Sequence, residues 1–147
     1  MAFHARLASL SAMLFSVPAK PEIVRVRPRV LIADADRRVR QSLSDLLEVD
    51  GHLTVVGTAA SVREALEKIE RSSPDVLILD PRLPDLDAGL ALLRAVHRAW
   101  PAMRVVTMGW TDARENPEFG MVAHLPKDAS PEELVRAARL ACDAPIP

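Results

Sequence analysis

From Arg29 onward, short aliphatic runs alternate with longer stretches in which apolar residues recur every three or four positions. The runs predict five strands, at residues 30–32, 53–56, 76–79, 105–106 and 122–125. Most of these runs are apolar throughout, as expected for strands that are covered on both faces. The longer stretches therefore have to supply the elements that cover them.

The stretches between the runs have the spacing of amphipathic helices. In three of them the apolar residues share one helical face: Val39, Leu43, Leu46 and Leu47; Val62, Leu66 and Ile69; Leu90, Leu93 and Val96. A last helix is predicted to begin at Ser130-Pro131, with the serine as N-cap, the proline at the first helical position and Glu133 three residues after the cap. Its buried side would consist of Leu134, Ala137, Ala138 and Ala141.

Five alternations of strand and helix predict a doubly wound α/β fold. In this fold a five-stranded parallel sheet forms the middle of three layers, its crossovers are right-handed, and helices cover both faces. Ligands bind such sheets at the carboxyl ends of the strands, near the point where the strand order reverses. Functional residues are therefore expected directly after the apolar runs.

Residues 1–28 differ from the rest of the chain. The spacing of their apolar residues predicts an amphipathic helix with Phe3, Leu7, Leu10, Leu14 and Val17 on one face. A linker with three prolines follows, at Pro18, Pro21 and Pro28. We favour a docked or partner-binding helix, or a poorly ordered extension, over a signal peptide with its apolar region at residues 8–17, because Arg6 is a weak basic start. We expect one domain at residues 29–142 and a short tail at residues 143–147.

The composition is that of a globular protein, with 147 residues, of which 49% are hydrophobic and 27% charged. A formal charge of -1 argues against a nucleic-acid-coating or polybasic protein. The single cysteine, Cys142, excludes an internal disulfide and fits a reducing compartment. No uncharged apolar run reaches the roughly 18 residues that a membrane span needs, so we expect a soluble protein.

Three charged residues follow predicted strands: Asp34 the first, Asp80 the third and Lys127 the fifth. Two neighbouring carboxylates repel each other unless a cation lies between them, and a hard divalent ion is a natural partner for their oxygens. A lysine ammonium beside them can hold a phosphate oxygen. A purely structural interpretation is also open, in which Asp34 and Asp36 cap the first helix and Lys127 pairs with Asp80.

The sequence around these residues resembles the receiver domain of bacterial response regulators, over residues 29–141. The matching segments are Arg29-Val30-Leu31-Ile32-Ala33-Asp34, then Pro74 to Asp80 with Leu83-Pro84-Asp85, and Leu125-Pro126-Lys127-Asp128-Ala129-Ser130-Pro131-Glu132-Glu133-Leu134. The last segment is similar to receivers that precede helix-turn-helix output domains. The resemblance implies a flavodoxin-like fold.

The same resemblance implies roles for individual residues. Asp80 would accept a phosphoryl group from a histidine kinase or phosphotransfer protein, and Lys127 would contact it. Mg²⁺ would be held by Asp34, Asp80 and the backbone carbonyl of Arg82. The protein would act in the cytoplasm through a downstream protein partner, without binding DNA directly and without being an enzyme beyond its own phosphorylation and dephosphorylation. A homodimer is also open.

The metal-binding pattern is incomplete in this chain, because Ala35 stands where receivers usually carry a second acid. Asp36 could substitute, since residues two apart in an extended segment point the same way. We favour Asp36 as the N-cap of the first helix. Since Mg²⁺ is typically held by one or two carboxylates plus water and phosphate, a weaker site is expected.

The signal-reading positions also depart from the family pattern. Gly109 stands at the usual Ser or Thr, and neither Thr107, which lies further back along the strand, nor Thr111, which lies past its end, is taken as a replacement. His124 stands at the aromatic switch position, where we favour a half-buried strand residue over a pH sensor; the chain has no tyrosine.

Other departures surround these positions. Only a shortened fourth helix fits between Gly109 and Lys127, and Trp110 is expected to fill the space that it leaves, although it could also cover the site or anchor a partner. Ala88 resembles an insertion before Gly89, which suggests a bulge or a longer loop.

Two functional hypotheses remain open. In the first, the chain is a receiver that is phosphorylated on Asp80. In the second, it is a pseudo-receiver that binds partners regardless of phosphorylation. A hydrolase that uses the same carboxylates is a weaker third hypothesis, because the sequence has no second catalytic constellation and no glycine-rich phosphate loop.

Overall fold

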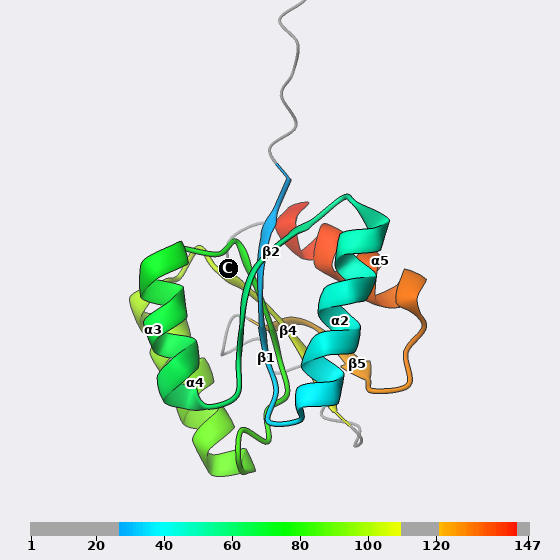
Figure 1. Ribbon diagram of the computed structural model, residues 1–147. Coiled ribbons are helices and arrows are strands. Elements are labelled where there is room, and N and C mark those ends of the chain that lie inside the picture. Colours follow the sequence, from blue (N-terminus) through cyan, green and yellow to red (C-terminus); the bar gives the residue numbers. More distant parts are fainter. Residues whose placement is uncertain (1–26, 110–120, 144–147) are drawn as a thin grey trace, which may run out of the picture.

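The computed structural model describes residues 27–109 and 121–143 (Figure 1). Its elements, in chain order, are β1 (Arg29–Ala33), α2 (Arg37–Asp50), β2 (Thr54–Ala59), α3 (Val62–Ser72), β3 (Val76–Leu79), α4 (Leu86–Ala99), β4 (Arg104–Gly109), β5 (Met121–Pro126) and α5 (Pro131–Asp143). The predicted alternation of strands and helices is confirmed from β1 to β4 and from β5 to α5, and the connection between β4 and β5 lies outside the described residues. Within the described residues, no helix is both long and apolar enough to cross a membrane.

The five strands form one parallel sheet in the order β2-β1-β3-β4-β5. Helices α3 and α4 cover one face and α2 and α5 cover the other, which gives the expected three-layer, flavodoxin-like α/β fold (Figure 1). The strand order reverses between β1 and β3. The chain first adds β2 on one side of β1 and then adds β3, β4 and β5 on its other side. The carboxyl ends of β1 and β3 therefore mark the place where a ligand site is expected.

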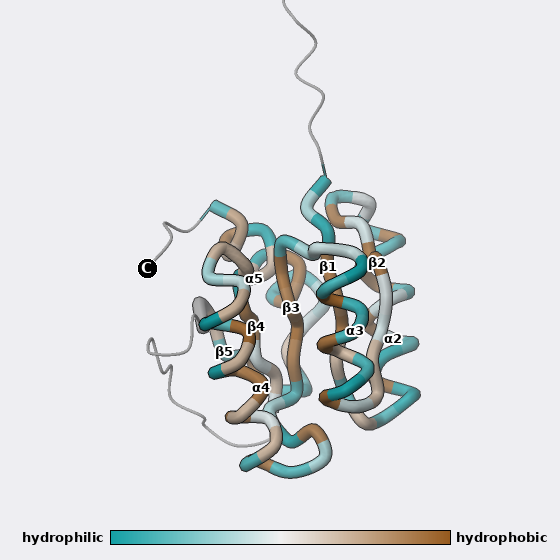
Figure 2. The backbone as a smooth tube through the Cα atoms, turned by 90° about the vertical axis from the view of Figure 1, so that its left-hand side faces the viewer, coloured by the Kyte–Doolittle hydropathy of each residue, from teal (hydrophilic) through white to brown (hydrophobic). Residues whose placement is uncertain are grey.

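Alternating strand residues supply two separate cores, one on each face of the sheet. Leu31, Leu77 and Leu79 pack beneath α3 and α4, whereas Ile32 and Ile78 pack beneath α2 and α5. Figure 2 shows the continuous hydrophobic colour along the central strands. This double burial explains why the central runs are apolar throughout and do not alternate with polar residues.

Side-chain caps fix where the helices begin. The predicted reciprocal cap of α5 is confirmed: the Ser130 backbone N–H donates to Glu133 Oε2 at 2.7 Å, and the Glu133 N–H donates to Ser130 Oγ at 3.2 Å. Asp36 caps α2 by accepting from the Arg38 N–H at 2.8 Å. These caps satisfy backbone donors that the first helical turn leaves free.

Strand β4 extends beyond residues 105–106, the apolar pair from which it was predicted. The pattern missed the rest of the strand because it includes two buried polar residues. Thr107 is 1% exposed and Arg104 is 7% exposed. Arg104 Nε donates to the Ala141 carbonyl oxygen near the end of α5 at 3.2 Å.

Three expectations lie outside the described residues: the extension before Arg27, the shortened helix after β4, and the position of Trp110.

Candidate functional site

Three charged side chains meet at the carboxyl edge of the sheet, and we call Asp34, Asp80 and Lys127 the acceptor edge. Each residue is fixed by a backbone hydrogen bond to a neighbouring strand. The N–H groups of Asp34 and Asp80 donate to Ala59 and Ala33 at 3.0 and 2.9 Å, and the Lys127 N–H donates to Gly109 at 3.2 Å. The sheet therefore holds the three side chains in place.

The Lys127 ammonium lies between the two carboxylates. Its Nζ is 2.8 Å from Asp34 Oδ2 and 2.6 Å from Asp80 Oδ2. All three side chains are largely buried, with exposed fractions of 9% for Lys127, 4% for Asp34 and 11% for Asp80. The expectation that these strand ends converge is confirmed, and the lysine is shared by both acids.

The charge state of Lys127 follows from two opposing effects. Burial disfavours the ammonium and by itself lowers the pKa, but the hydrogen bonds and charges of Asp34 and Asp80 outweigh it and raise the pKa of Lys127 above its usual 10.5. The lysine is therefore a cation at neutral pH. With both acids ionised, the cluster carries a net charge of about -1, which favours a further cation.

The remaining carboxylate oxygens accept backbone hydrogen bonds. Asp34 Oδ1 accepts from the Asp36 N–H at 2.8 Å, and Asp80 Oδ1 accepts from the Arg82 N–H at 2.9 Å. These bonds stabilise the ionised carboxylates and orient them toward the rim. The segment that follows Asp80 thus helps to position the carboxylate of Asp80.

Arg40 is a positioning residue that sequence reasoning missed. Its Nη1 donates to the carbonyl oxygens of Asp34 at 2.7 Å and Ala35 at 3.1 Å. This contact fastens the loop between β1 and α2 onto the first turns of α2. The only sequence signal would have been a long cationic side chain six positions after Asp34.

The oxygen ligands available to a magnesium ion are fewer than in the usual receiver pattern. Asp34 and Asp80 supply carboxylates, and the Arg82 backbone follows directly, but Ala35 has no side-chain oxygen and Asp36 Oδ1 is engaged in the helix cap. Across residues 27–109 and 121–143, no three His, Cys, Asp or Glu side chains form a metal-binding group. Two carboxylates still suit Mg²⁺, which keeps several water ligands.

A second set of residues joins β4 to β5, and we call Thr107, Gly109 and His124 the β4–β5 seam. Thr107 pairs with His124 across the strands, and Thr107 Oγ1 lies 2.7 Å from His124 Nδ1. A Cβ atom at Gly109 would lie 3.5 Å from His124 Cε1, so the imidazole ring packs beside the glycine. The half-buried position expected for His124 is confirmed.

The segment between Asp80 and α4 is held by close packing at a glycine. A Cβ atom at Gly89 would lie 1.6 Å from the Pro81 carbonyl oxygen, so only glycine fits there without movement. Asp85 caps α4 by accepting from the Ala88 N–H at 2.9 Å. The expected bulge or longer loop at Ala88 is wrong, because α4 begins at Leu86 and Ala88 belongs to its first turn.

Comparison with known proteins gives a consistent result. The family description "Response regulator receiver domain" matches residues 30–139. A protein-glutamate methylesterase/protein-glutamine glutaminase of Oleidesulfovibrio alaskensis is 33% identical over 79% of this chain and 34% of its own length. The DNA-binding transcriptional activator DevR/DosR of Mycobacterium tuberculosis is 35% identical over 76% of this chain and 52% of its own length. The chain thus spans about a third to a half of these relatives.

Solved structures share the same fold. The response regulator domain of Thermotoga maritima CheB has a TM-score of 0.71 and 26% identity, and the match covers 80% of this chain and 98% of that domain. A CheY-like receiver domain protein from Methanospirillum hungatei has a TM-score of 0.69 and 29% identity, with 79% and 94% covered.

Proposed function

Since the chain belongs to the response regulator receiver family, we propose that it accepts a phosphoryl group on Asp80 and transmits the change through protein contacts. The observation that carries this proposal is the Lys127 ammonium, which lies 2.6 Å from Asp80 Oδ2 and 2.8 Å from Asp34 Oδ2. It supplies a fixed cation beside a carboxylate that remains 11% exposed at the rim of the sheet.

The transfer requires a nucleophile in line with the leaving group and little other covalent chemistry. A carboxylate oxygen of Asp80 forms the new bond to phosphorus as the bond from phosphorus to the donor histidine nitrogen breaks. The histidine leaves with its ring neutral after proton uptake, and Asp80 becomes an acyl phosphate. Hydrolysis by water later restores the carboxylate and releases inorganic phosphate.

Lys127 moves from one partner to another in this proposal. Before transfer its ammonium neutralises part of the charge of Asp34 and Asp80. After transfer it contacts an oxygen of the phosphoryl group and keeps Asp34 as its second partner. Such preorganised donors stabilise charge that develops during the reaction.

Asp34, Asp80 and the Arg82 carbonyl would hold Mg²⁺. When bound, the ion offsets the negative charge of the phosphoryl oxygens. Because Ala35 replaces the usual second acid, we expect weak binding, and micromolar affinity in a calorimetric titration would contradict this expectation. Asp36 remains with the helix cap and does not become a metal ligand.

The proposed donor is a histidine kinase or phosphotransfer protein, and the proposed recipient of the signal is another protein in the cytoplasm. Direct contact with nucleic acid is not part of the proposal, since the net charge is -1. Homodimerisation stays a prediction that oligomeric-state measurements would test.

A second candidate function is supported by the β4–β5 seam. Gly109 offers no hydroxyl, and Thr107 Oγ1 is bonded to His124. A pseudo-receiver with this seam would bind its partner equally well with and without phosphorylation. The two candidates differ in whether Asp80 reacts.

The test is incubation of the full chain with acetyl phosphate and Mg²⁺, followed by intact mass measurement. We expect a mass increase of one phosphoryl group that is lost in the Asp80→Asn variant. Asp85→Asn is the matched control, because this carboxylate caps α4 and faces no lysine in the acceptor edge. An unchanged mass in the wild-type chain would favour the pseudo-receiver.

A further inference from the structure

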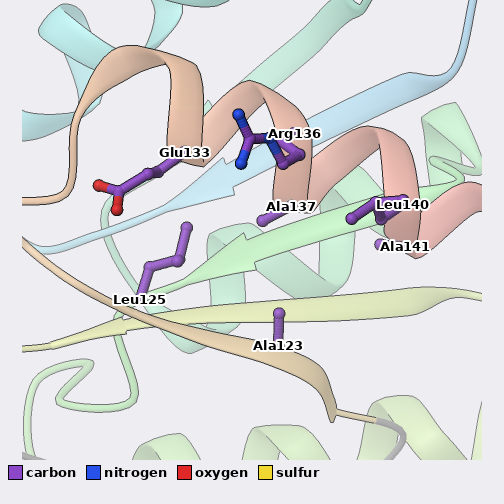
Figure 3. Close-up of a pocket in the computed structure, with 7 residues that line it drawn as sticks. All are labelled: Ala123, Leu125, Glu133, Arg136, Ala137, Leu140 and Ala141. Atoms are coloured by element: carbon purple, nitrogen blue, oxygen red, sulfur yellow. The ribbon is translucent and has the colours of Figure 1, made fainter.

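An apolar groove lies between β5 and α5, and none of its lining residues belongs to the acceptor edge. Its volume is about 420 Å³, and Figure 3 shows Ala123 and Leu125 of β5 facing Ala137, Leu140 and Ala141 of α5, with Glu133 and Arg136 toward the other end. The half-buried side chains of Ala123 and Leu125 thus form the floor of the groove, and α5 forms one wall. The groove has the lining of a site for apolar side chains.

Leu140 makes this groove unusual on the described surface. It is 61% exposed and is one of only three large hydrophobic side chains in the described residues that are strongly exposed, the others being Val49 and Leu86. Of these three, Leu140 alone lines the groove. Leu140 extends the apolar lining of the groove onto the surface, which gives the two together the character of an interaction site.

Residues 3–17 carry an apolar stripe of matching character. Its members are spaced by four, three, four and three positions: Phe3, Leu7, Leu10, Leu14 and Val17. This 3.5-residue repeat is typical of a helix that packs a narrow apolar stripe against one partner surface. Ala5 and Ala12 fall on the opposite side of such a helix.

The chain enters the described fold beside the C-terminal turns of α5, the helix that also lines the groove. Arg27 and Pro28 line a hollow together with Arg139, Cys142 and Asp143, in the last turns of α5. From Ala141 back to Glu133, the length of the groove along α5 is about 12 Å. The nine residues between Val17 and Arg27 can span about 30 Å when extended. The stripe can therefore reach the groove of its own chain.

We propose that residues 3–17 form an amphipathic helix that occupies the groove between β5 and α5 of the same chain. A short tether gives the segment a millimolar effective concentration at the groove, so a modest affinity is enough to keep it bound. A partner that uses the face of β5 and α5 must then displace the segment. This interaction does not depend on phosphorylation of Asp80.

The test compares amide NMR spectra of the full chain with those of the double variant Leu7→Asp/Leu10→Asp. We expect amide shifts at Ala123, Leu125 and the groove side of α5, with α3 and α4 unchanged. The matched control is Ala5→Asp/Ala12→Asp, which adds the same charge on the side of the helix opposite the stripe and leaves the groove signals in place. Identical groove signals in the wild type and in Leu7→Asp/Leu10→Asp would overturn the proposal.

The reciprocal variant is Leu140→Asp, whose exposed position spares the core. We expect the amide signals of residues 7–14 to move toward unstructured values, while the signals of α2 and α3 remain. All groove signals of the wild type should stay constant over a tenfold dilution. Shifts that change on dilution, together with a dimer in sedimentation, would mean that a second copy fills the groove and would refute the intramolecular assignment.

Discussion

The acceptor edge and the β4–β5 seam lie on the same sheet, yet they differ in what holds them together. In the acceptor edge, buried charges depend on one another, because Lys127 bridges Asp34 and Asp80. In the seam, a hydrogen bond between side chains joins Thr107 to His124, and the ring lies beside Gly109. The comparison teaches that the residues proposed to carry phosphoryl transfer are also held by buried ion pairs, whereas position 109 in the seam has no side-chain hydroxyl.

This difference predicts how a signal would spread. A ligand shifts a conformational equilibrium only through contacts that differ between the two states. In the proposed function, a phosphoryl group on Asp80 would change the partners of Lys127 directly, because Lys127 already contacts Asp80. At position 109 no hydroxyl is available to follow the phosphate, so we expect the seam to respond weakly.

The largest expected effect is that of Lys127→Met. Removing the ammonium leaves two buried carboxylates facing each other, and we expect the free energy of unfolding to fall by about 3 kcal/mol. Labelling by acetyl phosphate should also be lost. Urea unfolding measures the stability change, and Arg63→Met, which removes an exposed pair with Glu67, is the control that should leave stability unchanged. An equal loss in both variants would argue against a special role for Lys127.

Gly89→Ala tests the segment that positions Asp80. The new Cβ would lie 1.6 Å from the Pro81 carbonyl oxygen, so the segment or α4 has to move, and we expect a loss of about 2 kcal/mol. Gly57→Ala is the matched control, because its nearest contacts would be 3.5 Å away, at Leu31 Cδ1 and Lys68 Cδ. If thermal unfolding shows the same stability for Gly89→Ala as for Gly57→Ala, the close packing described above is wrong.

Restoring the residues that receivers usually carry at positions 35 and 109 should speed labelling of the chain by acetyl phosphate. We expect Ala35→Asp/Gly109→Thr to raise the rate of acetyl phosphate labelling about fivefold, equivalent to roughly 1 kcal/mol of transition-state stabilisation. Ala35 is exposed, and a Cβ at Gly109 would meet only an ordinary contact, so the fold should tolerate the change. An unchanged rate measured by intact mass would mean that other departures limit the reaction.

The smallest expected effect is a change in how stability depends on pH. Because the folded state raises the pKa of Lys127 above 10.5, its contribution is fully present below the unfolded pKa and is lost as pH rises through the higher folded value. Stability should therefore decline above the ordinary lysine pKa of 10.5, and less steeply in Lys127→Met.

Few other groups titrate in this alkaline range, because the chain has three lysines and no tyrosine. Burial also raises the pKa of the Cys142 thiol, so both proteins should carry Cys142→Ala. Equal alkaline slopes for the two proteins in urea unfolding would contradict the assignment to Lys127.

The sequence was sufficient to predict which charged residues follow the buried strands and therefore lie at one edge of the sheet. Continuous apolar runs such as residues 76–79 revealed buried parallel strands, and the carboxyl ends of parallel strands necessarily share one edge. That is why Asp34, Asp80 and Lys127 could be predicted to meet. The capping role of Asp36 followed from the same local reasoning.

Other features depend on side-chain directions that no sequence spacing fixes. Lys127 could have paired with one acid alone, and the structure shows it between both. Arg40 bonds to two carbonyl oxygens, and buried Arg104 reaches from β4 to the Ala141 carbonyl oxygen, 37 positions away. Ala88 was mistaken for a loop residue because the cap at Asp85 was not recognised.

The most direct test of the contrast between the two regions is an amide NMR titration of the full chain with beryllofluoride and Mg²⁺. We predict large shifts at Asp34, Arg82 and Lys127, with little change at Thr107, Gly109 and His124. Large shifts along the β4–β5 seam, or none in the acceptor edge, would contradict the account.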